Sequence, residues 1–193
     1  MVSKLWDVDV IINNLKNSSS YKSSYFCKNK KLMINQQQLI IKMALDNWNT
    51  QVTRADKLFN ALSDAQLKEE VAIERNSGIY LLGHLTAIHD ALFPLLGLGE
   101  KLYPPLEDIF IKNPDKSGIE KPMIKDLRIY WTEVNKNLSQ HFNQFTTDEW
   151  FQKHTSVTDE DFEKEPHRNK LNVLLNRTNH LAYHLGQLAF LKK

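Results

Sequence analysis

The stretch Asn179–Leu188, NHLAYHLGQL, is the most informative part of this chain, because it places His180 and His184 four residues apart in an apolar segment with helical periodicity. Residues at positions i and i+4 of a helix lie on the same face, about 5–6 Å apart at Cβ. Two imidazoles with this spacing can bind one metal ion. The pair therefore predicts a helix with a candidate metal-binding edge.

A third histidine, His84, lies in a second apolar segment, YLLGHLTAIHDALFPLL (80–96). Burying a lone polar side chain costs a few kcal/mol, so His84 is expected to have a partner. Two histidines from one helix and one from another would give three nitrogen ligands and leave an open position, which is typical of a catalytic metal site. On spacing alone, histidines that are merely hydrogen-bonded are an equally good interpretation.

The composition is that of an ordinary globular protein. The chain has 193 residues, of which 41% are hydrophobic and 25% charged, and this length fits one domain with a single core. Its one cysteine, Cys27, excludes an internal disulfide and fits a reducing compartment, so we expect a cytoplasmic protein. No uninterrupted apolar run approaches the roughly 18–20 residues that span a bilayer, so we expect no membrane association.

The charge is distributed unevenly along the chain. Residues 1–32 carry six lysines against Asp7 and Asp9, whereas residues 33–193 are close to neutral, which gives no support to nucleic-acid binding. The polar Ser/Asn/Lys composition of residues 1–32 predicts a disordered arm, an upstream extension or a misassigned start. A basic arm that packs on the domain or on an acidic partner is the alternative. We expect the functional domain at residues 33–193.

The rest of the chain has the apolar periodicity of helices joined by turns. The predicted helices cover residues of about 35–60, 77–96, 122–145 and 169 to near the end. Short capped helices are expected after Ser63 and after Thr146, and Pro122 is expected in the first turn of the third long helix. The segment 97–122 is a long loop, with a short helical piece at LEDIFI (106–111). The pattern predicts an all-α four-helix bundle with a long loop between helices two and three.

The segments LLGHLTAIHD (81–90) and NHLAYHLGQL resemble the DinB/YfiT-like superfamily over about residues 35–193. The resemblance implies a four-helix bundle that carries a divalent metal ion on three histidines. One histidine comes from a Gly-His segment of helix two and two come from an HxxxH followed by Gly-Gln. The matching positions are His84, His180 and His184, with Gly186 and Gln187 after them.

What the resemblance implies about activity is broader. Relatives include transferases and an isomerase that use low-molecular-weight thiols, together with metal-dependent hydrolases. The expected cofactor is zinc or nickel, with a low-molecular-weight thiol as an optional cosubstrate, and the expected partner is a small-molecule substrate. A homodimer is left open. The alternative is a non-catalytic helical bundle in which the metal is structural or absent.

Three further residues are candidates for the surroundings of the metal. Gln187 lies three residues beyond His184 on the same strip, so we expect it to contact a ligand histidine or to line the pocket. His154 and Trp150, which precede the last helix, are candidates for the pocket rim. Exposure of Gln187 on the helix surface, a solvated His154 and a packing Trp150 are the alternatives.

Deleting residues 1–32 tests the expected domain boundary. A disordered terminus makes few buried contacts, so the shortened chain is expected to keep its melting temperature and its metal binding. A large fall in melting temperature would show instead that the arm packs on the domain.

Overall fold

The computed structural model describes residues 36–192, and the chain divides into two compact units, residues 1–42 and 43–193. In the first unit, residues 36–42 are helical; in the second, the same conformation covers residues 43–61. The predicted arm at residues 1–32 lies outside the described residues. No strand occurs between residues 36 and 192, where only two isolated β-bridges form. The predicted all-α fold is confirmed.

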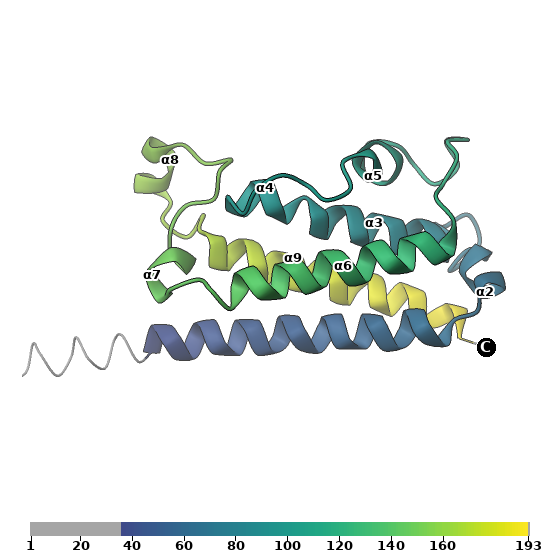
Figure 1. Ribbon diagram of the computed structural model, residues 1–193, viewed down its shortest axis with the longest axis horizontal. Helices are drawn as coiled ribbons and strands as arrows, with labels where there is room; N and C mark the ends of the chain where they lie inside the picture. Colours follow the sequence, from purple (N-terminus) through teal and green to yellow (C-terminus); the bar gives the residue numbers. More distant parts are fainter. Residues whose placement is uncertain (1–35, 193) are drawn as a thin grey trace, which may run out of the picture. The chain divides into compact units, whose positions relative to one another are not determined.

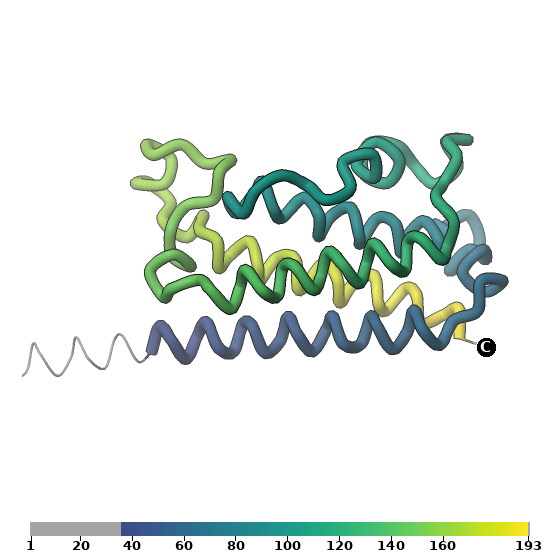
Figure 2. Tube along the Cα trace, viewed as in Figure 1, coloured from purple at the N-terminus to yellow at the C-terminus, as the bar shows by residue number. Residues whose placement is uncertain are grey.

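The second unit consists of helices of very different lengths. After residue 61 they are α2 (Asp64–Lys68), α3 (Gly78–Asp90), α4 (Leu92–Leu96), α5 (Pro105–Glu107), a π-helix (Asp108–Lys112), α6 (Ile124–Phe142), α7 (Thr147–Trp150), α8 (Asp159–Lys164), α9 (Lys170–Leu188) and a 3-10 turn (Ala189–Leu191). Residues 43–61, α3, α6 and α9 run alongside one another, and the short helices lie at their ends or over α3 (Figure 1). The chain path shows how the 97–123 connection returns over α3 before α6 begins (Figure 2).

Helix α3 is the central element of this unit. It packs against α6, α9, α2 and the segment of α5 and the π-helix, and most of its side chains are buried. The span Gly78–Leu96 is long and apolar enough to cross a membrane. However, 67% of its most apolar stretch is buried inside the protein, as in the core helix of a folded domain. Its apolar character is therefore explained by packing.

Polar side-chain caps mark the start of several helices. Ser63 and Gln66 form a capping box at α2, and Thr146 and Glu149 form one at α7, both as predicted. The Asn169 side chain accepts from the backbone N–H of Asn172 and starts α9 where the sequence places it. The two capping boxes fix the start of α2 and α7, short helices that bury only one residue each.

Three boundaries differ from the prediction. The helix expected over 77–96 is interrupted at Ala91, because Pro94 has no N–H to donate to the carbonyl of Asp90. Pro122 is not in a helical turn: Met123 is an extended N-cap (ψ 146°), so α6 begins at Ile124. That helix also ends at Phe142 rather than near residue 145, because Thr146 must be extended to cap α7.

Helix α8 is not among the predicted helices. Its N-terminal signal is present in the sequence, since Thr158 caps the helix and three acidic residues fill the first turn. No residue of α8 is buried, so the apolar periodicity that identifies the other helices is absent.

The close approach between α3 and the π-helix requires a glycine at position 83. A Cβ atom at Gly83 would overlap the ring of Phe110, whose side chain is fully buried. Only glycine therefore lets the π-helix lie this close to α3. The next residue along α3 is His84, so the same approach places the backbone of Phe110 beside a candidate metal ligand.

We expect Gly83→Ala to lower the free energy of unfolding by about 1–3 kcal/mol, because a methyl group is forced into a filled core. Gly186→Ala is the matched control: it is also a helical glycine, but a Cβ atom added there would meet nothing within 4 Å. It is expected to gain up to about 1 kcal/mol from helix propensity. Chemical denaturation of both variants measures the contrast, and equal effects would contradict the packing argument.

Candidate metal centre

The structure brings His84, His180 and His184 together, with one ligand atom from each lying within 4.8 Å of the others. His180 Nε2 lies 3.3 Å from His84 Nε2 and 3.1 Å from His184 Nε2. Helix α3 supplies the first ring and successive turns of α9 supply the other two. Nitrogen ligands about 2.0–2.1 Å from a tetrahedral zinc ion would be separated by about 3.3 Å, so these spacings fit a metal ion.

The hydrogen bonds made by Nδ1 of His84 and His184 define which nitrogen of each ring carries the proton. His84 Nδ1 lies 2.8 Å from the carbonyl oxygen of Phe110, which can only accept, so Nδ1 carries the proton. His184 Nδ1 lies 2.7 Å from Gln187 Oε1 and is protonated for the same reason. In the neutral form of each ring, Nε2 then presents a lone pair toward His180.

Hydrogen bonding alone does not satisfy this arrangement. His180 Nε2 can carry one proton at most, so it can donate to only one of the two lone pairs that face it. His180 Nδ1 is buried and has no partner among the described residues. A cation among the three Nε2 atoms would satisfy all three lone pairs, and the donor set therefore fits the group that the spacing predicted.

Burial keeps the three rings neutral. It lowers the pKa of His84 and His184, and it lowers the pKa of His180 to about 4, with a further contribution from the neighbouring His184. Neutral imidazole is the form that binds a metal ion. At neutral pH the cluster is ready to bind without losing protons.

Side chains on both helices orient the cluster. The ring of Tyr80 lies nearly parallel to that of His84, at 6.1 Å between centroids, and its hydroxyl donates to the carbonyl of Asn113 at 2.8 Å. The Gln187 amide accepts from His184 and donates through Nε2 to the Tyr183 hydroxyl at 3.1 Å. Gln187 thus lies beside a cluster histidine. The contacts of Tyr80, Phe110 and Tyr183 were not foreseen, because they depend on tertiary packing.

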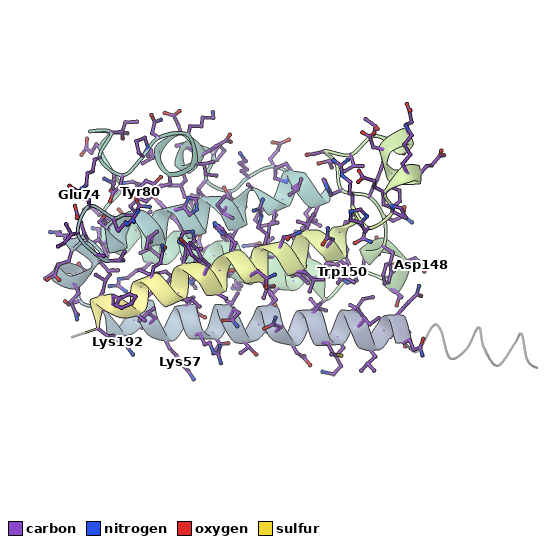
Figure 3. The ribbon with its side chains drawn as sticks, turned by 180° about the vertical axis from the view of Figure 1, so that it is seen from behind. Lys57, Glu74, Tyr80, Asp148, Trp150 and Lys192 are labelled. Carbon is purple, nitrogen blue, oxygen red and sulfur yellow. The ribbon has the colours of Figure 1, made fainter. Side chains whose placement is uncertain are left out.

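The two candidates for the pocket rim are placed elsewhere. Trp150 is buried, and its ring packs on those of Phe142 and Phe145. It lies beside the N-terminal end of α9, whereas Tyr80 lies on α3 toward the other end (Figure 3). His154 is half-buried and its Nδ1 has no partner in the described chain. No contact given by the structure joins either residue to the three histidines, and their role at the rim stays a prediction.

His89 occupies a different site from the cluster. It is completely buried between Trp48 and Trp131, with ring centroids 4.6 and 4.9 Å away, and its Nδ1 lies 2.8 Å from Asn135 Oδ1. A pocket of about 660 Å³ between residues 48–60 and α6 is lined by Trp48, Trp131 and Asn135 but by none of the cluster histidines. The pocket and the candidate metal centre are therefore separate features.

A comparison with protein families identifies the superfamily of this chain. The sequence profile of the DinB superfamily matches residues 48–188, which is most of the chain. The chain belongs to the DinB superfamily. No curated protein matches the chain.

The DinB-superfamily match includes all three cluster histidines and Gln187. Membership and geometry are both compatible with metal binding in this DinB-superfamily protein. They leave the reaction undefined, because the cluster could serve more than one chemistry.

The pH dependence of stability tests the buried position of His89. Burial lowers its pKa from 6.5 to about 3. Below pH 6.5 the unfolded chain binds a proton that the folded chain excludes, so stability is full above pH 6.5 and falls as the pH drops toward 3. The slope from this group is about 1.4 kcal/mol per pH unit.

His89→Gln keeps a donor toward Asn135 but removes the titration. We expect the wild type to lose stability relative to this variant between pH 6 and pH 4, as measured by urea denaturation at each pH. Parallel pH profiles for the two proteins would contradict the assignment.

Proposed function

We propose that this protein binds one divalent metal ion, zinc or nickel, through Nε2 of His84, His180 and His184, and uses it in a reaction on a small molecule. The proposal rests on one observation: the Nε2 atoms of three neutral imidazoles converge, and they cannot all form hydrogen bonds with one another. The metal-ligating group comprises three histidines, with no acidic or cysteine residue in it among residues 36–192. A fourth coordination position is then left for water or substrate, as in catalytic sites.

The reaction class that fits is a metal-dependent thiol transfer or hydrolysis. A divalent ion in such a site lowers the pKa of a coordinated water to about 7 or holds a coordinated thiol as thiolate, so that a nucleophile exists at neutral pH. Three neutral ligands leave the full charge of the ion available for this effect. A low-molecular-weight thiol is the proposed cosubstrate of the transferase, and a cytoplasmic location is proposed with it.

The protein residues contribute orientation. The Phe110 carbonyl and the Gln187 amide hold the Nδ1–H groups of His84 and His184, which turns both Nε2 atoms inward. Such outer contacts raise the basicity of the ligand and commonly change metal affinity by about 10–100-fold. Burial of the cluster among α3, α9 and the π-helix keeps the rings neutral and limits access of water.

Metal analysis of the full chain tests the proposal. After saturation with zinc or nickel and desalting, we expect about one ion per chain, because the three nitrogens form one site. His184→Ala is expected to lose at least tenfold in affinity. His167→Ala is the matched control, since His167 is exposed and has no place in the cluster.

A catalytic role makes a further demand. Turnover in a screen of thiol cosubstrates and electrophiles should disappear with a chelator and return with added metal. Absence of bound ion in the wild type, or equal binding by His184→Ala, would contradict the metal site. Bound metal with every position filled by protein atoms would instead support a structural ion.

A further inference from the structure

Arg177 lies on α9 one turn before His180 and two turns before His184. Spacings of three and seven residues place all three side chains on one face of the helix. The positive charge of Arg177 is among the causes that lower the pKa of both His84 and His180. The charge of the guanidinium is therefore felt at the candidate metal centre.

Within the described part of the chain, Arg177 differs from the other partly buried arginines, Arg128 and Arg168, in having no partner. Arg128 donates to the carbonyl oxygens of Phe59 and Leu62, and Arg168 forms an ion pair with Glu165. For Arg177, the structure gives no hydrogen bond or ion pair within residues 36–192, and its Nε is buried without an acceptor. Partial burial lowers the pKa of the Arg177 guanidinium.

Among residues 36–192, the charge of Arg177 gains no stabilising partner. Arg177 is partly exposed, but burying its Nε–H without an acceptor is unfavourable, and its charge would also repel a divalent ion bound nearby. A residue that costs stability at a candidate site is typical of one retained for binding. Its planar set of donors matches the two oxygens of a carboxylate.

We propose that Arg177 binds a carboxylate of the small molecule that occupies the open metal position, so that the substrate or thiol cosubstrate is an anionic compound. The assignment rests on the proposed metal function and narrows its substrate class. Arg177 would fix one end of the molecule by a bidentate contact while the reacting atom lies at the metal, and this holds the two in a defined geometry.

Two probes of similar size test the assignment by calorimetry on the metal-loaded full chain. The probes are 3-mercaptopropionate, which carries a carboxylate, and 2-mercaptoethanol, which does not. We expect the wild type to bind 3-mercaptopropionate at least tenfold more tightly. Arg177→Met should reduce this preference to within about threefold, with the affinity for 2-mercaptoethanol unchanged. Arg168→Met removes the same charge from a partly buried arginine that is paired with Glu165, and it should keep the preference.

Two further readouts separate ligand binding from a structural role. Arg177→Met is expected to melt at the same or a higher temperature, because it removes an unpaired cation, and Arg177→Lys should retain only part of the preference. A lower melting temperature together with an unchanged preference would overturn the assignment. So would binding of neither probe, or equal binding of both, by wild-type protein that holds metal. Failure of the wild type to bind metal at all would overturn the proposed function itself.

Discussion

Three imidazole nitrogens that face one another cannot all be satisfied by hydrogen bonds, and the interpretation of this site depends on that constraint. Phe110 and Gln187 hold the outer protons of His84 and His184, so their inner nitrogens have only lone pairs to offer. His180 lies 3.1 and 3.3 Å from them and can donate to one at most. Such an arrangement inside a folded protein is costly unless a cation occupies it.

The fold supports this arrangement through one helix. Helix α3 is buried on most of its surface and is packed on several sides. Its two histidines lie on different faces and therefore have different surroundings. His84 faces α9 and the π-helix, whereas His89 points into the core between two tryptophans. Gly83 lets Phe110 approach the helix closely enough for its carbonyl to reach His84. The packing of the core and the orientation of a candidate ligand are thus set by the same contact.

The parts of the structure that depend on local sequence were predicted well. Caps at Ser63, Thr146 and Asn169 are short-range signals, and the apolar periodicity located the long helices. The spacing of His180 and His184 placed both on one helical face, which the structure reproduces. The break at Ala91 was also a local feature, but the strong apolar pattern of residues 77–96 concealed the effect of Pro94.

The parts that depend on tertiary contacts could not be derived in this way. A backbone carbonyl such as that of Phe110 has no sequence signature, and neither does the absence of an acidic partner for Arg177 among residues 36–192. Helix α8 lacks buried residues, so only its cap and acidic first turn indicate it. The convergence of His84 with the α9 pair was a hypothesis from the helical placement of the three histidines and from the resemblance until the distances were known.

X-ray absorption spectroscopy of the zinc-loaded or nickel-loaded full chain tests the central claim most directly, because it reports the ligands of the ion. We expect scattering from three imidazoles at about 2.0–2.1 Å for zinc, together with at least one light-atom ligand that is replaced by sulfur when a thiol is added. A spectrum without three imidazole ligands would contradict the assignment of His84, His180 and His184 as the metal site.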